Sequence, residues 1–228
     1  MVVLLLGMTI IWAKNSVDTS RFVISTDTVL KNDLIISPGK SLVINEGVTI
    51  RLDGYRSIVI QGLLIACGTD SRPIVFASVD RARGSADRPT WNGLEVRGKD
   101  AHARLRHCRI EGAFRNLIWE ANAVFDSCKF AGNHYGLYAA KKTVPQVQNC
   151  VFYLNTYAVA SDFASPIIAG NTFTNNVIGI YQQLGSSAYV TKNIFSANQT
   201  DIKLEESLGK NNSMLSTQHL WDVMRQCF

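Results

Sequence analysis

A repeat of 20 to 22 residues runs through the second half of the chain and restricts the possible folds more than any other feature. It is easiest to follow in a column at spacings of 20, 22, 21 and 22 residues: Cys108, Cys128, Cys150, Asn171 and Asn193. Apolar residues lie three positions before this column and two and nine positions after it. Asn fills four of the five positions five after it, and Gly, Asn, Asp or Ala lies eight after it. Five repeats that agree at six columns are typical of a solenoid, in which each repeat packs on the next.

Each period has room for three short strands separated by three bends. Apolar and polar residues alternate within the repeat, which is the periodicity of strands and not of helices. The Gly, Asn and Asp residues eight positions after the first column predict a bend at which the backbone φ is positive. We therefore predict a parallel β-solenoid whose turns, here called rungs, stack at the ~4.8 Å spacing of neighbouring strands.

Like residues recur at two interior columns of this solenoid. The amide column contains Asn133, Asn155, Asn176 and Asn198. Each buried amide can donate to the amide of the next rung, so that the polar group is satisfied along the stack. The aromatic column contains Phe130, Phe152, Phe173 and Phe195. We expect these rings to be buried and to fill the interior with aromatic surface.

The first hundred residues follow the same pattern with looser spacing. Apolar residues alternate from Leu34 to Ile65 and are punctuated by turn residues such as Pro38 and Gly54. A polar insertion at residues 78–90 precedes the sequence WNGLEV. Alignment of Gly93 with the bend column places Leu94 beneath Leu117. Three N-terminal rungs and five repeats predict about eight rungs.

Three segments carry a resemblance to a known family: SPGKSLVINEGVTI, GLLIACGTDSRPIVFAS and WNGLEV, followed by N-x-F-x-x-N repeats. Over residues 27–205 the chain resembles the right-handed parallel β-helix repeat proteins of the pectin-lyase-like superfamily. The resemblance implies an all-β, right-handed parallel β-helix. It says less about activity, because the superfamily contains polysaccharide lyases, hydrolases and epimerases beside many non-catalytic surface proteins. The opening segment looks most like large exported surface proteins of bacteria.

The two ends of the chain are interpreted separately from the β-helix domain, which we place at residues 21–206. Residues 1–20 contain an apolar stretch from Val2 to Trp12, which has the length of a signal-peptide core and is too short for a membrane-spanning helix. Export to the periplasm, cell surface or extracellular space is the first interpretation, with membrane contact only through this segment; an N-terminal strand is the alternative. Residues 207–228 form either a C-terminal tail or a cap, with a short amphipathic helix over residues 216–228.

Composition excludes several classes of protein. An apolar content of 46% and a charged content of 18% exclude an intrinsically disordered chain. No apolar run reaches the roughly 18 residues that cross a bilayer, which excludes a polytopic membrane protein. Five Cys are too few, and odd in number, for a disulfide framework. Cys108, Cys128 and Cys150 are expected to point inward as small apolar residues, with a thiol cluster or one disulfide as alternatives.

The chain lacks the motifs of the common catalytic and metal sites. No C-x-x-C, H-E-x-x-H, G-x-S-x-G or glycine-rich phosphate loop is present. The resemblance implies that a hydrolase of this superfamily has three clustered Asp with a His, and that an epimerase has Asp-Pro-His-Asp. A lyase has calcium-binding carboxylates with an Arg or Lys base. None of these sets is found, so we expect no cofactor, no metal ion and no catalysis.

One outer face remains as a candidate site, because the superfamily's enzymes work on the strand that follows the bend. There the pattern places side chains outward at Ile118 and at six candidate ligand-binding residues: Arg97, Glu120, Tyr138, Asp162, Tyr181 and Gln183. Glu120 and Asp162 lie two rungs, or ~9.6 Å, apart, at the upper end of the separation in inverting glycosidases. They are weak catalytic candidates, with isolated surface carboxylates as the alternative. Tyr138 and Tyr181 either stack on sugar rings or reflect β-propensity alone.

The net charge of +5 indicates a preference for anionic partners. Basic residues are concentrated at Arg81, Arg83, Arg88, Arg97, Lys99, Arg104, Arg106, Arg109 and Arg115. No aromatic–basic nucleic-acid motif is present, so an acidic glycan or another envelope component is the expected partner. The resulting hypothesis is a non-catalytic exported scaffold or binding module that recognises an anionic polysaccharide. The alternatives are a polysaccharide lyase or hydrolase and an assembly subunit that associates end to end.

Overall fold

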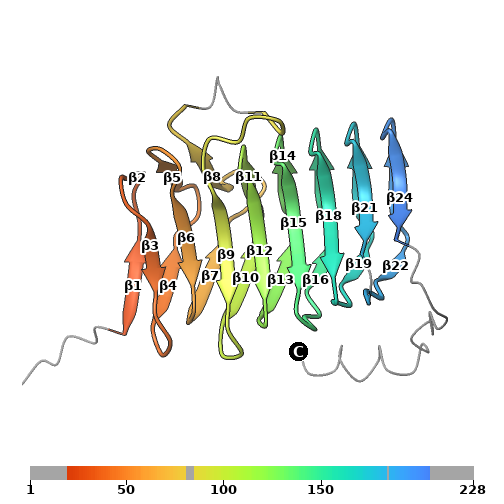
Figure 1. Cartoon of the computed structure of the whole chain (residues 1–228). Coiled ribbons are helices and arrows are strands. Elements are labelled where there is room, and N and C mark those ends of the chain that lie inside the picture. The colour runs from red at the N-terminus through yellow and green to blue at the C-terminus, as the bar shows by residue number, and fades with distance from the viewer. Residues whose placement is uncertain (1–19, 81–84, 184, 206–228) are drawn as a thin grey trace, which may run out of the picture.

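The computed structural model describes residues 20–80, 85–183 and 185–205, and in these ranges it contains strands and turns but no helix. The strands wind into a parallel β-solenoid of eight rungs, each of which contributes one strand to each of three sheets (Figure 1). The prediction of an all-β solenoid with about eight rungs is confirmed. The proposed signal segment and C-terminal cap lie outside the described residues.

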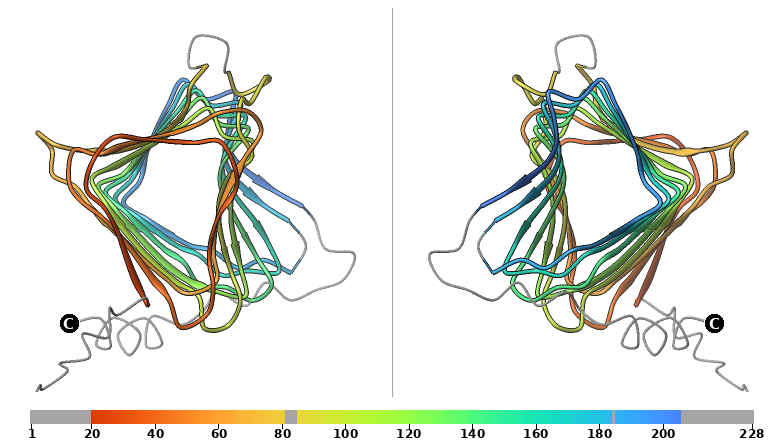
Figure 2. Two further views of the ribbon diagram at one scale, coloured as in Figure 1. Left: turned by 90° about the vertical axis from the view of Figure 1, so that its left-hand side faces the viewer. Right: turned by 90° about the vertical axis from the view of Figure 1, so that its right-hand side faces the viewer.

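The three sheets have eight parallel strands each, and along the chain one strand of sheet A is followed by one of sheet B and one of sheet C. Sheet A consists of β1 (Arg21–Ile24), β4 (Ser41–Ile44), β7 (Leu63–Cys67), β10 (His102–Arg106), β13 (Asn122–Asp126), β16 (Gln146–Gln148), β19 (Ile167–Ala169) and β22 (Tyr189–Thr191). Sheet B consists of β2 (Thr28–Leu30), β5 (Thr49–Leu52), β8 (Ile74–Ser78), β11 (Cys108–Glu111), β14 (Lys129–Ala131), β17 (Val151–Tyr153), β20 (Thr172–Thr174) and β23 (Ile194–Ser196). Sheet C consists of β3 (Leu34–Ile36), β6 (Ser57–Ile60), β9 (Gly93–Arg97), β12 (Arg115–Trp119), β15 (Tyr135–Ala140), β18 (Tyr157–Asp162), β21 (Ile178–Gln182) and β24 (Thr200–Leu204). Viewed along the solenoid, the three sheets enclose one interior (Figure 2).

The aromatic column lies in this interior as predicted. Phe130, Phe152, Phe173 and Phe195 are register partners on successive strands of sheet B. Their ring centroids are 4.8, 5.0 and 5.0 Å apart, and the rings are nearly parallel. Phe152 and Phe173 are fully buried, which confirms the register of the repeat.

The amide column also forms the predicted ladder. The side-chain amide of Asn133 donates to Oδ1 of Asn155 at 3.0 Å, and the same bond recurs from Asn155 to Asn176 and from Asn176 to Asn198 at 2.9 Å. Each Oδ1 also accepts the backbone N–H of the Asn one rung earlier. A second ladder joins Asn171 to Asn193 at 3.0 Å. Every polar group of these buried side chains is therefore used to bind one rung to the next.

The predicted bend column has a different role. Of the residues assigned to it in sheet C, only Gly93 has a positive φ, of 139°. Gly136 and Gly179 are required for space instead, because a Cβ at either position would lie 2.5 Å from the carbonyl oxygen of the next strand. The left-handed residues lie at the other corners, for example at Asn149 and Leu154, both with φ of 54°.

The register of sheet C also corrects one predicted alignment. Between β12 and β15 the register shifts by one residue, so that Leu117 pairs with Tyr138. Leu117 also pairs with Glu95 of β9, and Leu94 does not lie beneath it. Because successive side chains of a strand point to opposite faces, Ile118 joins the buried core and does not face outward as predicted.

Candidate ligand-binding face on sheet C

The outer face of sheet C brings together four of the six predicted site residues. Tyr138 in β15 lies two rungs from Tyr181 in β21, with the small residue Ala160 of β18 between them in register. Tyr138 can therefore reach across β18: its hydroxyl lies 3.2 Å from Oε1 of Gln183 and 3.4 Å from Oδ2 of Asp162. These contacts form a polar cluster over β15, β18 and the end of β21.

The hydroxyl of Tyr138 remains protonated in this cluster. Burial raises the pKa of Tyr138 to about 12, and the nearby negative charge of Asp162 adds to the shift. The group is therefore a hydrogen-bond donor at neutral pH and is not suited to act as a general base.

Glu120 does not join Asp162 in the predicted way. Trp119, and not Glu120, is in register with Asp162. Trp119 of β12 pairs with Ala140 of β15, and Ala140 pairs with Asp162 of β18. Glu120 follows the strand at a corner, is exposed and has a positive φ of 51°. The predicted carboxylate pair therefore depends on a register that the bulge between β12 and β15 has changed.

Arg97 lies at the end of β9 and is held by a buried carboxylate. Its Nε is 2.5 Å from Oε2 of Glu95, a residue that is only 6% exposed. Glu95 also accepts from the side-chain amide of Asn92 at 2.8 Å, and this amide contacts Ser57 Oγ at 2.7 Å. Arg97 is thus fixed two rungs away from Tyr138.

A row of stacked aromatic residues borders this face and was not among the predicted site residues. Tyr135 stacks on Tyr157 with centroids 4.8 Å apart, and Tyr157 stacks on Tyr181 at 5.4 Å. One corner further, Phe114 stacks on His134 at 5.3 Å. The 22-residue spacing of Tyr135 and Tyr157 was the signal that could have revealed the row.

Cations lie on several of these rings. The guanidinium of Arg115 lies 5.9 Å from the Phe114 centroid and 5.7 Å from that of Tyr138, and its Nε is buried without a hydrogen-bond partner among the described residues. Lys141 lies 5.3 Å from the ring of Trp119. Such contacts stabilise a cation without neutralising its charge.

Tyr181 is engaged on several sides. Lys203 lies 5.2 Å from its ring centroid, Tyr157 stacks on the ring, and its hydroxyl bonds to the carboxylate of Glu205. Less of the Tyr181 ring is therefore open to a sugar than the stacking hypothesis from the sequence assumes.

The basic residues that cluster in the sequence are distributed around the solenoid. Arg97 and Arg115 belong to sheet C, Arg104 and Arg106 to sheet A, and Arg109 to sheet B. The reason is that about 20 residues complete one rung and so visit all three faces. Arg81 and Arg83 lie outside the described residues, and the net positive charge is not concentrated on sheet C.

The three inward cysteines behave as a buried column. Cys108, Cys128 and Cys150 are free and buried, and their Sγ atoms lie near main-chain carbonyls, as Cys108 does 3.2 Å from that of Ala66. Burial raises the pKa of Cys108 and Cys150, which disfavours the reactive thiolate.

In the described part of the chain, no three His, Cys, Asp or Glu residues are grouped closely enough to hold a metal ion. The same ranges contain no helix that is long and apolar enough to cross a membrane.

Comparison with known proteins identifies the family. No curated protein and no solved structure shows a significant match to the chain. A family model described as the right handed beta helix region matches residues 92–218, more than half of the sequence. The chain therefore belongs to the right-handed β-helix family.

Proposed function

We propose that this β-helix is a non-catalytic, exported binding module of the cell envelope or surface, and that its face on sheet C binds an anionic polysaccharide. The observation that carries the proposal is the continuity of the face: aromatic and polar side chains succeed one another from β12 to β24 without a gap of a whole rung. The apolar stretch from Val2 to Trp12 supports export.

A polymer suits this face because its groups recur at the ~4.8 Å rung spacing. Several weak contacts can then act together on one chain. The hydroxyl of Tyr138 and the side chains of Asp162 and Gln183 offer a donor and acceptors for sugar hydroxyls.

Cations on the rings would supply the preference for acidic sugars. Arg115 and Lys141 lie against aromatic rings, and neither forms an ion pair with a carboxylate among the described residues. Their positive charge is therefore available to a ligand. An arginine in this position can contact a carboxylate through two parallel hydrogen bonds.

The test measures binding to immobilised polygalacturonate, alginate and neutral dextran. Acidic polymers should bind more tightly than dextran, and binding should weaken between about 0.1 M and about 1 M NaCl, where the Debye length falls from ~10 to ~3 Å. The double variant Tyr138→Phe/Tyr181→Phe keeps both rings and removes both hydroxyls, and should lose about threefold to tenfold in affinity. Equal binding of dextran, or unchanged binding by this variant, would contradict the proposal.

A charge-matched pair of variants tests the contribution of the cations. Lys141→Gln/Lys203→Gln removes two positive charges from the face on sheet C. Lys129→Gln/Lys192→Gln removes two exposed charges elsewhere on the solenoid. Only the first variant should lose affinity and salt dependence, whereas equal losses would indicate a non-specific charge effect.

The same preparations test the enzymatic alternative. Pectin, polygalacturonate and alginate incubated with the protein, with and without calcium, should stay intact. Turnover that disappears in Glu120→Gln or Asp162→Asn would replace the binding module with a polysaccharide-acting enzyme.

End-to-end association is a second candidate function, favoured by the end rungs. Phe22 and Val23 of β1 are exposed at the first rung, and Ile202 and Leu204 of β24 at the last. Open strand edges with apolar side chains can pair with another chain. Light scattering over a range of protein concentrations should then show a mass that grows with concentration, and a constant monomer mass would exclude this function.

A further inference from the structure

The outer face of sheet A carries a stripe of aliphatic side chains over its first three rungs (Figure 1). Val23 in β1 pairs in register with Val43 in β4, and Val43 pairs with Ile65 in β7. Leu63 lies two residues before Ile65 and therefore points to the same face. Val23 is 52% exposed and Leu63 37%, whereas Val43 and Ile65 are half-buried. Adjacent aliphatic side chains on an outer face mark a contact surface, and these four residues are called the apolar stripe below.

Basic residues lie at both ends of the apolar stripe. Arg21 is in β1, and Arg104 in β10 pairs with Ile65. Both arginines are exposed, and neither forms an ion pair among the described residues. Lys40, at the corner before β4, lies 5.6 Å from the centroid of the Phe22 ring. The strands β1, β4, β7 and β10 contain no Asp or Glu, so their outer face, here called the sheet A face, is basic as well as apolar.

The carboxylates around the sheet A face have cations beside them. Glu46 forms an ion pair of 2.9 Å with Arg72, and Asp126, on the next strand of the sheet, lies 3.5 Å from Arg106. Asp100, at the corner before β10, follows a lysine directly in the chain. The positive charges at the two ends of the apolar stripe are therefore not neutralised by the surrounding residues.

The most apolar segment of the sequence leads directly into sheet A. Residues Val2 to Trp12 are apolar, and eight residues separate Trp12 from Arg21. Eight residues reach at most ~29 Å when fully extended. Contact of the apolar segment with a bilayer would therefore hold β1 within this distance of the membrane. Sheet C forms a different side of the solenoid and stays accessible in this arrangement (Figure 2).

We propose that the sheet A face lies against an anionic phospholipid bilayer. The apolar stripe enters the headgroup region, and Arg21 and Arg104 contact lipid phosphates. A bilayer matches both features, because its interface combines apolar chains with negatively charged headgroups. An acidic polysaccharide would match the charge and leave the aliphatic side chains in water. The inference is independent of polymer binding on sheet C, and it extends the membrane contact beyond the N-terminal segment.

Cosedimentation of the full chain with large unilamellar vesicles tests this contact. Vesicles of phosphatidylcholine and phosphatidylglycerol should bind more tightly than phosphatidylcholine alone, and binding should weaken as NaCl rises from about 0.1 M to about 1 M. Arg21→Gln/Arg104→Gln should lose about 25-fold in affinity for the mixed vesicles, or about fivefold for each charge. Val23→Ser/Leu63→Ser should lose about tenfold through the smaller apolar area. All variants keep the N-terminal segment, so these differences report on the sheet A face.

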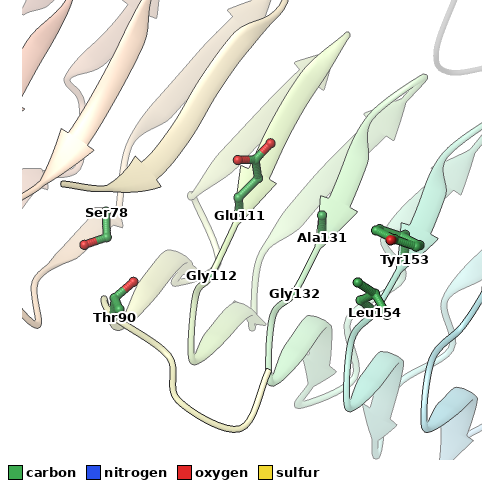
Figure 3. Close-up of a pocket in the computed structure, with 8 residues that line it drawn as sticks. All are labelled: Ser78, Thr90, Glu111, Gly112, Ala131, Gly132, Tyr153 and Leu154. Atoms are coloured by element: carbon green, nitrogen blue, oxygen red, sulfur yellow. The ribbon is translucent and has the colours of Figure 1, made fainter. Parts of the chain in front are cut away.

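Matched controls remove the same kinds of side chain elsewhere. Tyr153 and Leu154 are 39% and 48% exposed, close to the values for Val23 and Leu63. Figure 3 shows them at one end of a hollow where strands of sheet B end. Tyr153→Ser/Leu154→Ser should bind mixed vesicles like the wild-type protein. The same holds for Lys129→Gln/Lys192→Gln, which removes two exposed charges outside the sheet A face. Circular dichroism confirms that each variant is folded.

A fluorescent label on Cys67 reports the contact directly. Cys67 ends β7 on the sheet A face, and it is the exposed cysteine among the described residues. In a Cys227→Ser background, an environment-sensitive label on Cys67 should brighten when mixed vesicles are added. A label that stays dark while the protein cosediments would place the contact elsewhere and would overturn the proposal.

The vesicle measurements overturn the proposal if mixed vesicles do not bind, if phosphatidylcholine alone binds equally well, or if both sheet A variants bind like the wild type. Two other outcomes would also overturn it. Loss of alginate binding in the same variants would mean that the face recognises any polyanion. A dimer that is lost in Val23→Ser/Leu63→Ser would make it an interface between two copies. Tyr138→Phe/Tyr181→Phe should bind vesicles normally, so failure here is distinguishable from failure of polymer binding on sheet C.

Discussion

Asn155 makes four hydrogen bonds with a single side chain. Its Oδ1 accepts the backbone N–H and the side-chain amide of Asn133, both at 3.0 Å. Its Nδ2 donates to Asn176 Oδ1 at 2.9 Å and to the carbonyl of Phe130 at 3.0 Å. The residue is buried, so no water can replace these partners when the amide is removed.

Asn155→Ala should therefore be strongly destabilising. Each buried group left without a partner costs about 1–3 kcal/mol, so we expect a loss of at least about 3 kcal/mol in urea unfolding. Asn198→Ala is the control, because Asn198 ends the same ladder and is partly exposed, and it should cost about 1 kcal/mol. Equal losses for the two variants would mean that the ladder does not contribute through burial.

Tyr138 predicts a dependence of stability on alkaline pH. Its pKa is about 12 in the folded protein, raised first by burial and then by Asp162, whereas an unfolded tyrosine has a pKa of about 10. A raised pKa gives a stabilisation that is complete below pH 10 and is lost as the pH rises from 10 to 12. The difference in phenolate absorbance between the wild-type protein and Tyr138→Phe should have its titration midpoint near pH 12. The substitution Asp162→Asn should lower this midpoint, because it removes the negative charge beside the hydroxyl. A difference curve centred near pH 10 would contradict the assignment.

At the scale of elements, β15 and β18 approach each other closely at Gly136. A Cβ at this position would lie 2.5 Å from the carbonyl oxygen of Ala158 and 3.1 Å from the ring of Phe152. Backbone cannot move aside without separating the strands, so Gly136→Ala should cost about 3 kcal/mol. Gly132→Ala meets no atom and should cost about 1 kcal/mol through its positive φ. Thermal unfolding compares the two, and a larger loss for Gly132→Ala would exclude the close approach as the cause.

Most of the fold follows from the repeat, but the face on sheet C follows only in part. Counting two and five residues on from the Cys/Asn column predicts that Phe152 and Asn155 each stack on like residues of the neighbouring rungs. The count succeeds because inward-facing residues recur at constant offsets from that column. The bulge between Arg115 and Leu117 breaks that counting. The extra residue lies within β15, where Tyr135–Tyr138 lies opposite Arg115–Leu117, and it exchanges the faces of Leu117 and Ile118 relative to the count. The prediction therefore failed for Ile118 and Glu120, which follow the shift in the rung of β12, whereas Tyr138, Asp162 and Gln183 in the next rungs come together.

At the scale of the whole molecule, the rungs differ in how many neighbours they have. The first and last rungs pack on one side only among the described residues, and every residue of β24 is exposed. Inner rungs such as those of β11, β14 and β17 contain the fully buried residues Ile110, Phe130 and Phe152.

Amide hydrogen exchange should therefore show a gradient along the solenoid. Protection should be greatest in β11–β18 and should decline toward β1–β3 and β22–β24, because stability in a solenoid is close to a sum of nearest-neighbour terms. Mass spectrometry of peptides from a time course measures this profile. Uniform protection over all rungs would indicate that the molecule opens only as one unit.

The rung-to-rung pairing has a consequence for the rate of folding. Ile110 pairs with Phe130, Phe130 with Phe152 and Phe152 with Phe173, so partners lie only 20 to 22 residues apart in this part of the 228-residue chain. That separation corresponds to a relative contact order of about 0.1, which is in the range of fast-folding helical bundles and below that of most β-sandwiches. Only the first rung must close a loop without a template, and each later rung adds to an edge that already exists. We therefore expect an all-β protein whose slow step is nucleation, followed by rapid propagation along the chain.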